Sequence, residues 1–294
     1  MYSAAIVPLS VWRPLTEPSI SLSKRSKTRR VFGVDFSGAA DAARRLWIAE
    51  GRMQKGRLSI VDCAPIGRWA GLRAARAECH TAFLDLIAKS PDAMFGCDFP
   101  FGLPEFLMQG RSWLEFAGEF DKQFPLPEDF REHCRELANG TERRRSCDRD
   151  ARVPFAAYNL RIYRQTFYGI RDVLAAAMTR EAAAVIPMQE LAPDRAWIVE
   201  ACPASTLKSV GLYQPYKGAE RRHRAQRGRI LDHLEERGFT ATIEGKLRAT
   251  LLADQGGDAL DSVIAAAATA RAYRSGSLTR AASPLELIEG RIIW

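Results

Sequence analysis

The sequence of 294 residues lacks the signals of several protein classes. It contains no run of about 18 or more apolar residues, so we expect no membrane span. Its six cysteines form no CxxC pair and have no histidine at zinc-site spacing, which predicts free thiols. A secretory signal has an apolar core followed by small residues at the cleavage site, and the amino-terminal segment lacks this pattern. No internal repeat or low-complexity tract occurs. These absences predict a cytoplasmic globular protein.

The positive charge is concentrated at the amino terminus. The formal net charge is +8, but residues 1–30 hold six basic residues and one acidic residue, which leaves 37 basic and 34 acidic residues, a net of +3, in the remainder. Because the body of the chain is close to balance, its overall charge is weak evidence for a nucleic-acid partner. We expect residues 1–30 to form a mobile basic tail. Residues 31–294, with an ordinary globular composition, are expected to form a single domain.

An aspartate interrupts the first apolar segment, VFGVDFSG at residues 31–38. The segment predicts a buried strand that ends at Asp35, followed by a tight turn at Ser37 and Gly38. Burying a carboxylate is costly unless the carboxylate is paired or binds a cation. Asp35 therefore either binds a cation or caps the turn, and Ser37 either hydrogen-bonds to a metal-bound water or caps the same turn.

The rest of the chain has an α/β pattern with a change of composition in the middle. Further strands are predicted at residues 46–49, 58–62, 93–98 and 197–201, and residues 291–294 are a short apolar segment. Helices are predicted at residues 73–89, at 158–184, before Gly238 and after Gly257. The first three strands are close enough in sequence to form an antiparallel meander. Residues 104–192, rich in Phe and Tyr at helical spacing, are expected to form a mostly helical insertion.

Five carboxylates stand where strands end or a helix begins. Asp35, Asp98 and Glu200 lie in or at the end of apolar strands, and Asp258 and Asp261 lie on one face of the first turn of a helix. An α/β fold brings such positions to one edge of its sheet. Convergent carboxylates repel one another, so magnesium or manganese is the expected occupant, and two such ions suit phosphodiester hydrolysis. Alternatively, Asp258 interacts with its helix dipole and Glu200 pairs with an arginine.

The densest basic segment outside the amino terminus is KGAERRHRAQRGR at residues 217–229. The candidates for contacts with substrate phosphates in this segment are Lys217, Arg221, Arg222 and Arg224. The alternative is that they form the solvated face of a helix.

Six segments along the chain together resemble a known family. They are GVDFSGA at 33–39, CDFPFGLPE at 97–105, VEACPAS at 199–205, YKGAERRHRAQRGRIL at 216–231, GDALDSVIAAAATA at 257–270 and EGRIIW at 289–294. In this order they resemble the domain of unknown function 429 (DUF429) family, whose members are described as predicted nucleases with a ribonuclease H-like fold. The resemblance implies a five-stranded mixed sheet, with three antiparallel strands and then two parallel ones, flanked by helices.

The same resemblance implies roles for the carboxylates. Asp35 corresponds to the metal-binding aspartate of the first strand in ribonuclease H-like enzymes, and Asp98 corresponds to the carboxylate of the fourth strand. Asp258 and Asp261 are similar to the carboxylate pair on the last helix of Holliday-junction resolvases. Glu200 lies in a block typical of the family but has no counterpart in the resolvase pattern.

The leading hypothesis is a metal-dependent nuclease or phosphodiesterase with nucleic acid as its substrate. In this hypothesis Asp35 and Asp98 ligate a first metal, and Asp258 and Asp261 complete a second. One alternative is an actin-like phosphotransferase or ATPase, because GVDFSG resembles the first phosphate loop of those enzymes. They also need a Gly-Gly segment after a strand, whereas Gly256 and Gly257 follow no strand pattern. The other alternative is a non-catalytic binding module.

Overall fold

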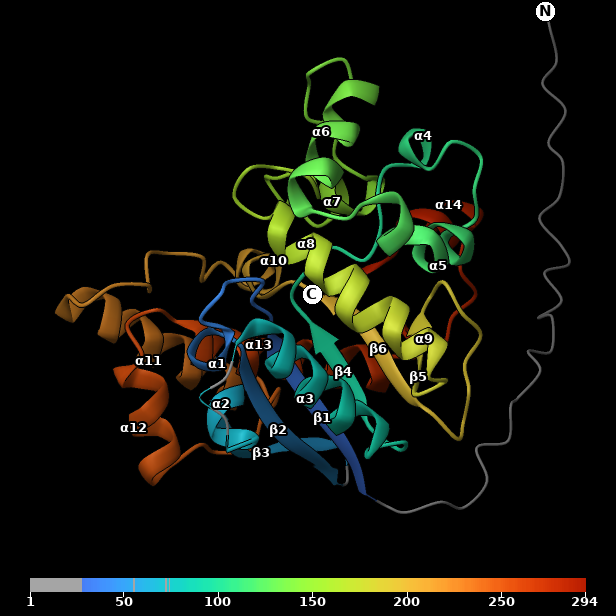
Figure 1. Cartoon of the computed structure of the whole chain (residues 1–294). Coiled ribbons are helices and arrows are strands. Elements are labelled where there is room, and N and C mark those ends of the chain that lie inside the picture. The colour runs from blue at the N-terminus through green and yellow to red at the C-terminus, as the bar shows by residue number, and fades with distance from the viewer. Residues whose placement is uncertain (1–27, 55, 72, 74) are drawn as a thin grey trace, which may run out of the picture.

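The structure is a computed structural model that describes residues 28–294 apart from residues 55, 72 and 74. One mixed β-sheet lies between two layers of helices (Figure 1). Of the predicted amino-terminal tail, residues 1–27 lie outside the described part. Residues 28–30 belong to the first strand of the sheet, so the sheet begins three residues earlier than the sequence predicts.

The described residues form a sheet of seven strands in the order β3-β2-β1-β4-β6-β5, with β7 paired to the end of β6. The strands are β1 (Thr28–Asp35), β2 (Trp47–Gln54), β3 (Arg57–Pro65), β4 (Met94–Cys97), β5 (Ala183–Ile186), β6 (Ala196–Ala201) and β7 (Ile292–Ile293). Strands β1, β2 and β3 form an antiparallel meander, and β4, β5, β6 and β7 add through parallel pairs. The predicted α/β class with a mixed, helix-flanked sheet is confirmed.

The sheet has two strands more than the five that the sequence predicts. Strand β5 begins where the helix predicted at residues 158–184 was expected to end, and only Ala183 and Ala184 lie within that range. Its four residues are all buried, as is typical of a parallel strand covered on both faces. Four apolar residues do not distinguish a buried strand from a buried helix by periodicity. Strand β7 forms from the predicted carboxyl-terminal apolar segment and is only two residues long.

The helices differ in length and in their place around the sheet (Figure 1). They are α1 (Ala42–Arg45), α2 (Ile66–Trp69), α3 (Arg76–Ala88), α4 (Glu105–Met108), α5 (Trp113–Gln123), α6 (Pro127–Leu137), α7 (Ser146–Asp150), α8 (Tyr163–Tyr168), the π-helix η1 (Gly169–Ala175), α9 (Ala176–Thr179), α10 (Pro203–Ser209), α11 (Arg221–Glu236), α12 (Gly245–Ala253), α13 (Asp258–Arg274) and α14 (Pro284–Glu289). In the described part of the chain, no helix has both the length and the apolar character needed to cross a bilayer.

Between β4 and β6 the chain forms helices α4 to α9 and strand β5. The single long helix predicted at residues 158–184 is instead a shorter helical stretch, α8, η1 and α9, which begins at Tyr163 and ends at Thr179. Its middle turn is π-helical, and π-helical turns are frequent at functional sites. Helices α4, α6, α7 and α8 stand beyond the carboxyl ends of β4 and β6 (Figure 1).

The two faces of the sheet bury different sets of side chains. Phe32 and Val34 of β1 pack on the face covered by α3 and η1, together with Phe83 and Phe95. Val31, one residue earlier in β1, packs on the opposite face. This alternation follows from the two-residue period of a strand. Both faces of β1 are therefore buried, and only its ends reach the surface.

Helix α13 lies unusually close to β1. A Cβ atom on Gly33 would stand 1.9 Å from the Ser262 carbonyl oxygen and 2.3 Å from the Ala266 nitrogen, so only glycine permits this approach. The Ala-rich sequence of α13 suits the same close packing, and its residues from Ala259 to Ala268 are buried. Because Gly33 is two residues before Asp35, this contact brings the first turn of α13 to the end of β1.

Candidate active site

Four aspartates gather at the carboxyl edge of the sheet. Asp35 is the last residue of β1, and Asp98 directly follows β4, the parallel neighbour of β1. The backbone N–H of Asp98 donates to the Val34 carbonyl at 2.9 Å, which fixes the two strand ends side by side. Asp258 and Asp261 come from the first turn of α13. We call these four residues, Asp35, Asp98, Asp258 and Asp261, the acidic cluster.

Electrostatic repulsion within the acidic cluster is strong. Burial and then the negative charges of Asp261, Asp258 and Asp98 raise the pKa of Asp35 well above its usual range. Burial, with the charge of Asp261 as the next cause, raises the pKa of Asp98 to about 8. Both effects favour the protonated carboxyl or a bound cation over an unpaired carboxylate. The four residues that the sequence predicted as metal ligands therefore interact with one another.

Asp35 and Asp98 have few partners other than the cluster itself. Each residue as a whole is of intermediate exposure. Within the described residues no hydrogen bond or ion pair ends on either carboxyl group. The backbone of Asp98 is held separately, because Gln165 of α8 donates to its carbonyl oxygen. Two carboxyl groups without donors among the described residues are free to bind a ligand through their oxygen atoms.

Asp261 is bound by two side chains of the loop before α11. The Tyr216 hydroxyl donates to its Oδ1 at 2.6 Å, and the Lys217 Nζ lies 2.7 Å from its Oδ2. The same ammonium group lies 3.8 Å from Oδ1 of Asp258. Lys217 was predicted to contact a substrate phosphate, but in the structure it neutralises part of the acidic cluster. Sequence reasoning missed this pairing because Lys217 lies 44 positions before Asp261.

The loop that carries Lys217 is itself held firmly. The buried Arg227 of α11 donates to the carbonyl oxygens of Tyr216 and Gly218, at 2.5 and 3.1 Å. Gly257, with φ of 80°, would place a Cβ atom only 3.0 Å from Cγ of Lys217, so a glycine leaves room for that side chain. Asp254 caps α13 by accepting from the Ala259 backbone N–H at 2.9 Å. Asp258 lies in the first turn of the same helix, where the predicted interaction with the helix dipole stays open.

Glu200 lies in a different environment. The Arg145 guanidinium holds it with two hydrogen bonds, of 2.5 and 2.8 Å, and the Phe101 backbone N–H donates to it at 3.0 Å. The same guanidinium binds Asp148 at 2.7 Å. We call Arg145, Asp148 and Glu200 the Arg145 centre; all three side chains are almost fully buried. Glu200 therefore pairs with an arginine, as the alternative interpretation of the sequence predicted.

Ser37 helps to form the turn after Asp35. Its Oγ accepts from the Ala39 backbone N–H at 3.3 Å. Its carbonyl oxygen lies 3.0 Å from Nε2 of the buried His80, and Nδ1 of His80 lies 2.8 Å from Oδ2 of Asp172 in η1. His80 and Asp172 thus support the loop behind Asp35 from two helices. No local sequence pattern singles out His80 for this role, since its partner Asp172 is 92 residues away.

Arg221, Arg222 and Arg224 are exposed on the first turns of α11. Arg222 pairs with the neighbouring Glu220 at 2.9 Å. Among the described contacts none joins these arginines to the acidic cluster. The structure therefore brings Lys217 to the cluster but leaves the three predicted phosphate contacts on an exposed helix surface.

The acidic cluster fits a hard divalent cation in its donor chemistry, since its side chains supply only carboxylate oxygens. The positions of these side chains fit a metal ion less well than their chemistry does. Among the residues that the structure describes, no group of three or more His, Cys, Asp or Glu side chains is arranged to hold a metal ion. One carboxylate of the set, that of Asp261, already faces an internal cation, Lys217.

The Gly-Gly segment required of an actin-like phosphotransferase has a different structural context. Gly256 and Gly257 follow helix α12, not a strand, and Gly257 is the residue before the first residue of α13. The two glycines belong to the turn that starts α13 and places Asp258 and Asp261.

The fold and the site define a mixed α/β domain with an acidic cluster at the carboxyl edge of its sheet. The sequence model of the family described as "Protein of unknown function (DUF429)" matches residues 33–286, and the chain belongs to this family. The resemblance found from the six segments is thereby confirmed. Neither the comparison with curated proteins nor that with solved structures finds a significant match.

Proposed function

We propose that this protein is a metal-dependent hydrolase of nucleic-acid phosphodiester bonds with a ribonuclease H-like fold. The strand order supports the fold assignment, because β3, β2, β1, β4 and β6 form three antiparallel strands followed by two parallel ones. Strands β5 and β7 are then additions at the edge beyond β6. Because one fold hosts many activities, the proposal for the activity rests on the site.

The observation that carries the proposal is the convergence of the acidic cluster. Three separate elements, β1, β4 and α13, deliver carboxylates whose charges raise one another's pKa values. The single basic side chain that contacts them within the described part, Lys217, leaves the cluster with excess negative charge. Perturbed carboxylates that converge at the carboxyl edge of an α/β sheet are typical of a functional site.

Magnesium or manganese is the cofactor in this proposal. Asp35 and Asp98 would hold one ion, and Asp258 with Asp261 would complete a second. When bound, such ions activate a water molecule and stabilise the leaving oxygen of a phosphodiester. The chain's own contribution is to fix the carboxylates through the contact between Gly33 and α13 and to support the Asp35 loop through His80.

Nucleic acid is the proposed partner, and Arg221, Arg222 and Arg224 are proposed to contact its phosphates at the exposed end of α11. Among the described residues none of the six cysteines forms a disulfide, which supports the proposed cytoplasmic location, where thiols are kept reduced.

A cleavage assay with magnesium or manganese tests the proposal on single-stranded, duplex and branched substrates. We expect Asp35→Asn to lower cleavage by more than about 100-fold, since even the loss of an outer partner of a metal ligand costs roughly 10- to 100-fold. Asp121→Asn, which changes an exposed aspartate of α5, is the matched control and should retain full activity. Equal activity in the Asp35→Asn variant would end the assignment.

A non-catalytic binding module is the second candidate. The pairing of Lys217 with Asp261 favours it, because an internal cation stands where a catalytic metal would be expected. Titration calorimetry with magnesium and manganese at low salt separates the candidates. No heat of binding at millimolar concentrations would favour the module and remove the main argument for catalysis.

A further inference from the structure

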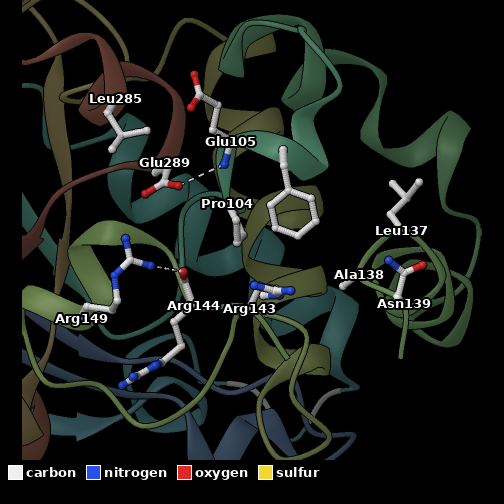
Figure 2. Close-up of a pocket in the computed structure, with 11 residues that line it drawn as sticks. Pro104, Glu105, Leu137, Ala138, Asn139, Arg143, Arg144, Arg149, Leu285 and Glu289 are labelled. Atoms are coloured by element: carbon white, nitrogen blue, oxygen red, sulfur yellow. Dashed lines mark hydrogen bonds between the residues drawn. The ribbon is translucent and has the colours of Figure 1, made fainter. Parts of the chain in front are cut away.

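A cavity lies beyond the carboxyl edge of the sheet, between α4, the segment from α6 to α7, and α14 (Figure 2). Its volume is about 530 Å³, within the usual range for small-ligand sites. Its walls combine three arginines with apolar side chains: Arg143, Arg144, Arg149, Phe106, Leu137 and Leu285. None of these residues belongs to the acidic cluster or to the predicted phosphate contacts of α11.

The three arginines of this cavity carry charge that the chain does not neutralise. Each is exposed and donates to a neutral oxygen: Arg143 to the Thr141 hydroxyl, Arg144 to the Val153 carbonyl and Arg149 to the Arg144 carbonyl. Within the described residues none of them forms an ion pair with a carboxylate. Guanidinium groups that lack acidic partners are suited to bind phosphate.

Two glutamates also line the cavity but do not neutralise the arginines. The Glu289 carboxylate accepts from the backbone N–H groups of Glu105 and Ser146, at 3.0 and 2.6 Å. The Glu105 side chain points away from the wall that carries Arg143 and Arg149 (Figure 2).

Phe106 adds an aromatic surface to the basic wall. It is 49% exposed, in contrast to the buried Phe101 and Phe116 nearby in the sequence. An exposed ring beside unpaired guanidinium groups is the combination that binds single-stranded nucleic acids: arginines contact the backbone, and a base stacks on the ring. A free anion would explain the arginines but not the exposed phenylalanine.

The cavity is also connected to the proposed active site. Helix α4 follows Asp98 in the chain through residues 99–104. Arg144 is the neighbour of Arg145, whose guanidinium binds Glu200, and Glu200 pairs in register with Cys97, the residue before Asp98. The chain segments that line the cavity are thus linked directly to those that carry Asp98 and Glu200.

We propose that the cavity between α4, α7 and α14 is a subsite for a nucleic-acid single strand, which binds one or two backbone phosphates through Arg143 and Arg149 and one base through Phe106. The inference rests on the proposed function for its ligand class, but it is tested by binding alone. DNA and RNA strands share this chemistry, and the experiment compares them.

The test is the anisotropy of fluorescent oligonucleotides of about ten nucleotides, one of DNA and one of RNA, titrated with the full chain in EDTA. We expect the double variant Arg143→Glu/Arg149→Glu to bind at least about tenfold more weakly and to lower the salt slope of log K by about 1 between about 50 and 200 mM salt. The control Arg57→Glu/Arg237→Glu carries the same charge change on two exposed arginines that do not line the cavity, and it should bind like the wild type.

The aromatic part of the subsite has its own pair of variants. Phe106→Ala should weaken binding by about tenfold with an unchanged salt slope, and Phe106→Trp should retain it, because stacking contributes about 1–3 kcal/mol per base. Circular dichroism confirms that each variant is folded. A stronger effect on one oligonucleotide than on the other identifies the type of strand.

Three results would overturn the inference: no oligonucleotide binding by the wild type at about 50 mM salt, wild-type binding by the cavity double variant, or equal losses in the cavity and control double variants. These results are independent of the cleavage assay. If cleavage occurs and the cavity variants bind normally, the proposed function survives and the subsite fails. If the cavity variants lose binding and no cleavage occurs, the subsite survives and the proposed function fails.

Discussion

The acidic cluster and the Arg145 centre lie next to each other at the same edge of the sheet, but their carboxylates are neutralised to different extents. In the Arg145 centre one buried guanidinium binds both Asp148 and Glu200, and the Phe101 backbone N–H adds a further donor. In the acidic cluster four carboxyl groups share the single ammonium of Lys217. The two groups therefore differ in how many internal donors serve each carboxylate.

This comparison predicts that the two groups respond in opposite ways when a charge is removed. Removing the cation of the Arg145 centre leaves buried carboxylates unpaired, whereas removing a carboxylate from the acidic cluster relieves repulsion. Stability measurements on the metal-free protein can therefore separate a structural ion pair from a site prepared for a ligand.

The largest effect is expected from Arg145→Met. The variant leaves Glu200 and Asp148 buried without their cation, so the free energy of unfolding should fall by about 3–5 kcal/mol. Urea denaturation measures this loss. Arg237→Met, at an exposed arginine, should change stability by less than about 0.5 kcal/mol. A similar small effect from Arg145→Met would show that the Arg145 centre is not a structural ion pair.

A pH-dependent effect is expected from Asp98. Its pKa is raised to about 8 in the folded protein by burial and by Asp261, whereas in an unfolded chain it is about 3.9. Between these values the folded state keeps a proton that the unfolded chain has released, so this group lowers the free energy of unfolding as the pH rises.

Asp98→Asn removes this pH-dependent loss of stability. In EDTA, the stability of the variant relative to the wild type should therefore increase by about 1–3 kcal/mol between about pH 5 and about pH 8.5. Asp121→Asn, the exposed control, should show no such trend. Parallel pH profiles for Asp98→Asn and the wild type would mean that Asp98 is not under the repulsion described.

A smaller gain in stability is expected from Asp35→Asn. The substitution keeps the shape of the side chain but removes the charge that Asp258, Asp261 and Asp98 oppose, so the metal-free protein should be stabilised by about 1–2 kcal/mol near pH 8. Thermal unfolding in EDTA checks the direction. Destabilisation would indicate that the Asp35 carboxylate has a structural partner.

The sequence predicts the positions of the acidic cluster but not the state of its members. Asp35 and Asp98 end strands, and Asp258 and Asp261 begin a helix, so local patterns and the geometry of an α/β sheet suffice to bring them together. Glu200 has the same local pattern and a different outcome. Its partner Arg145 lies 55 residues earlier in the chain, where nothing in the local sequence distinguishes it from the neighbouring arginines Arg143 and Arg144.

The same reasoning explains the errors in the fold. The meander and the strands at 93–98 and 197–201 follow from alternation and apolar runs that end at turns. Strand β5 is not predicted because four apolar residues suit a strand or a helix equally well. Its pairing with β6, which makes it a strand, comes from outside the segment itself. The π-helical turn η1 contains Asp172, which faces His80 of α3, a contact that depends on tertiary structure.

The most direct test of the central claim is titration calorimetry of the wild type and of Asp35→Asn with magnesium and manganese at low salt. The account predicts that the wild type binds a divalent cation at millimolar concentrations or below and that Asp35→Asn loses this binding, while Asp121→Asn binds like the wild type. No binding by the wild type, or undiminished binding by Asp35→Asn, would contradict the assignment of the acidic cluster as a metal site.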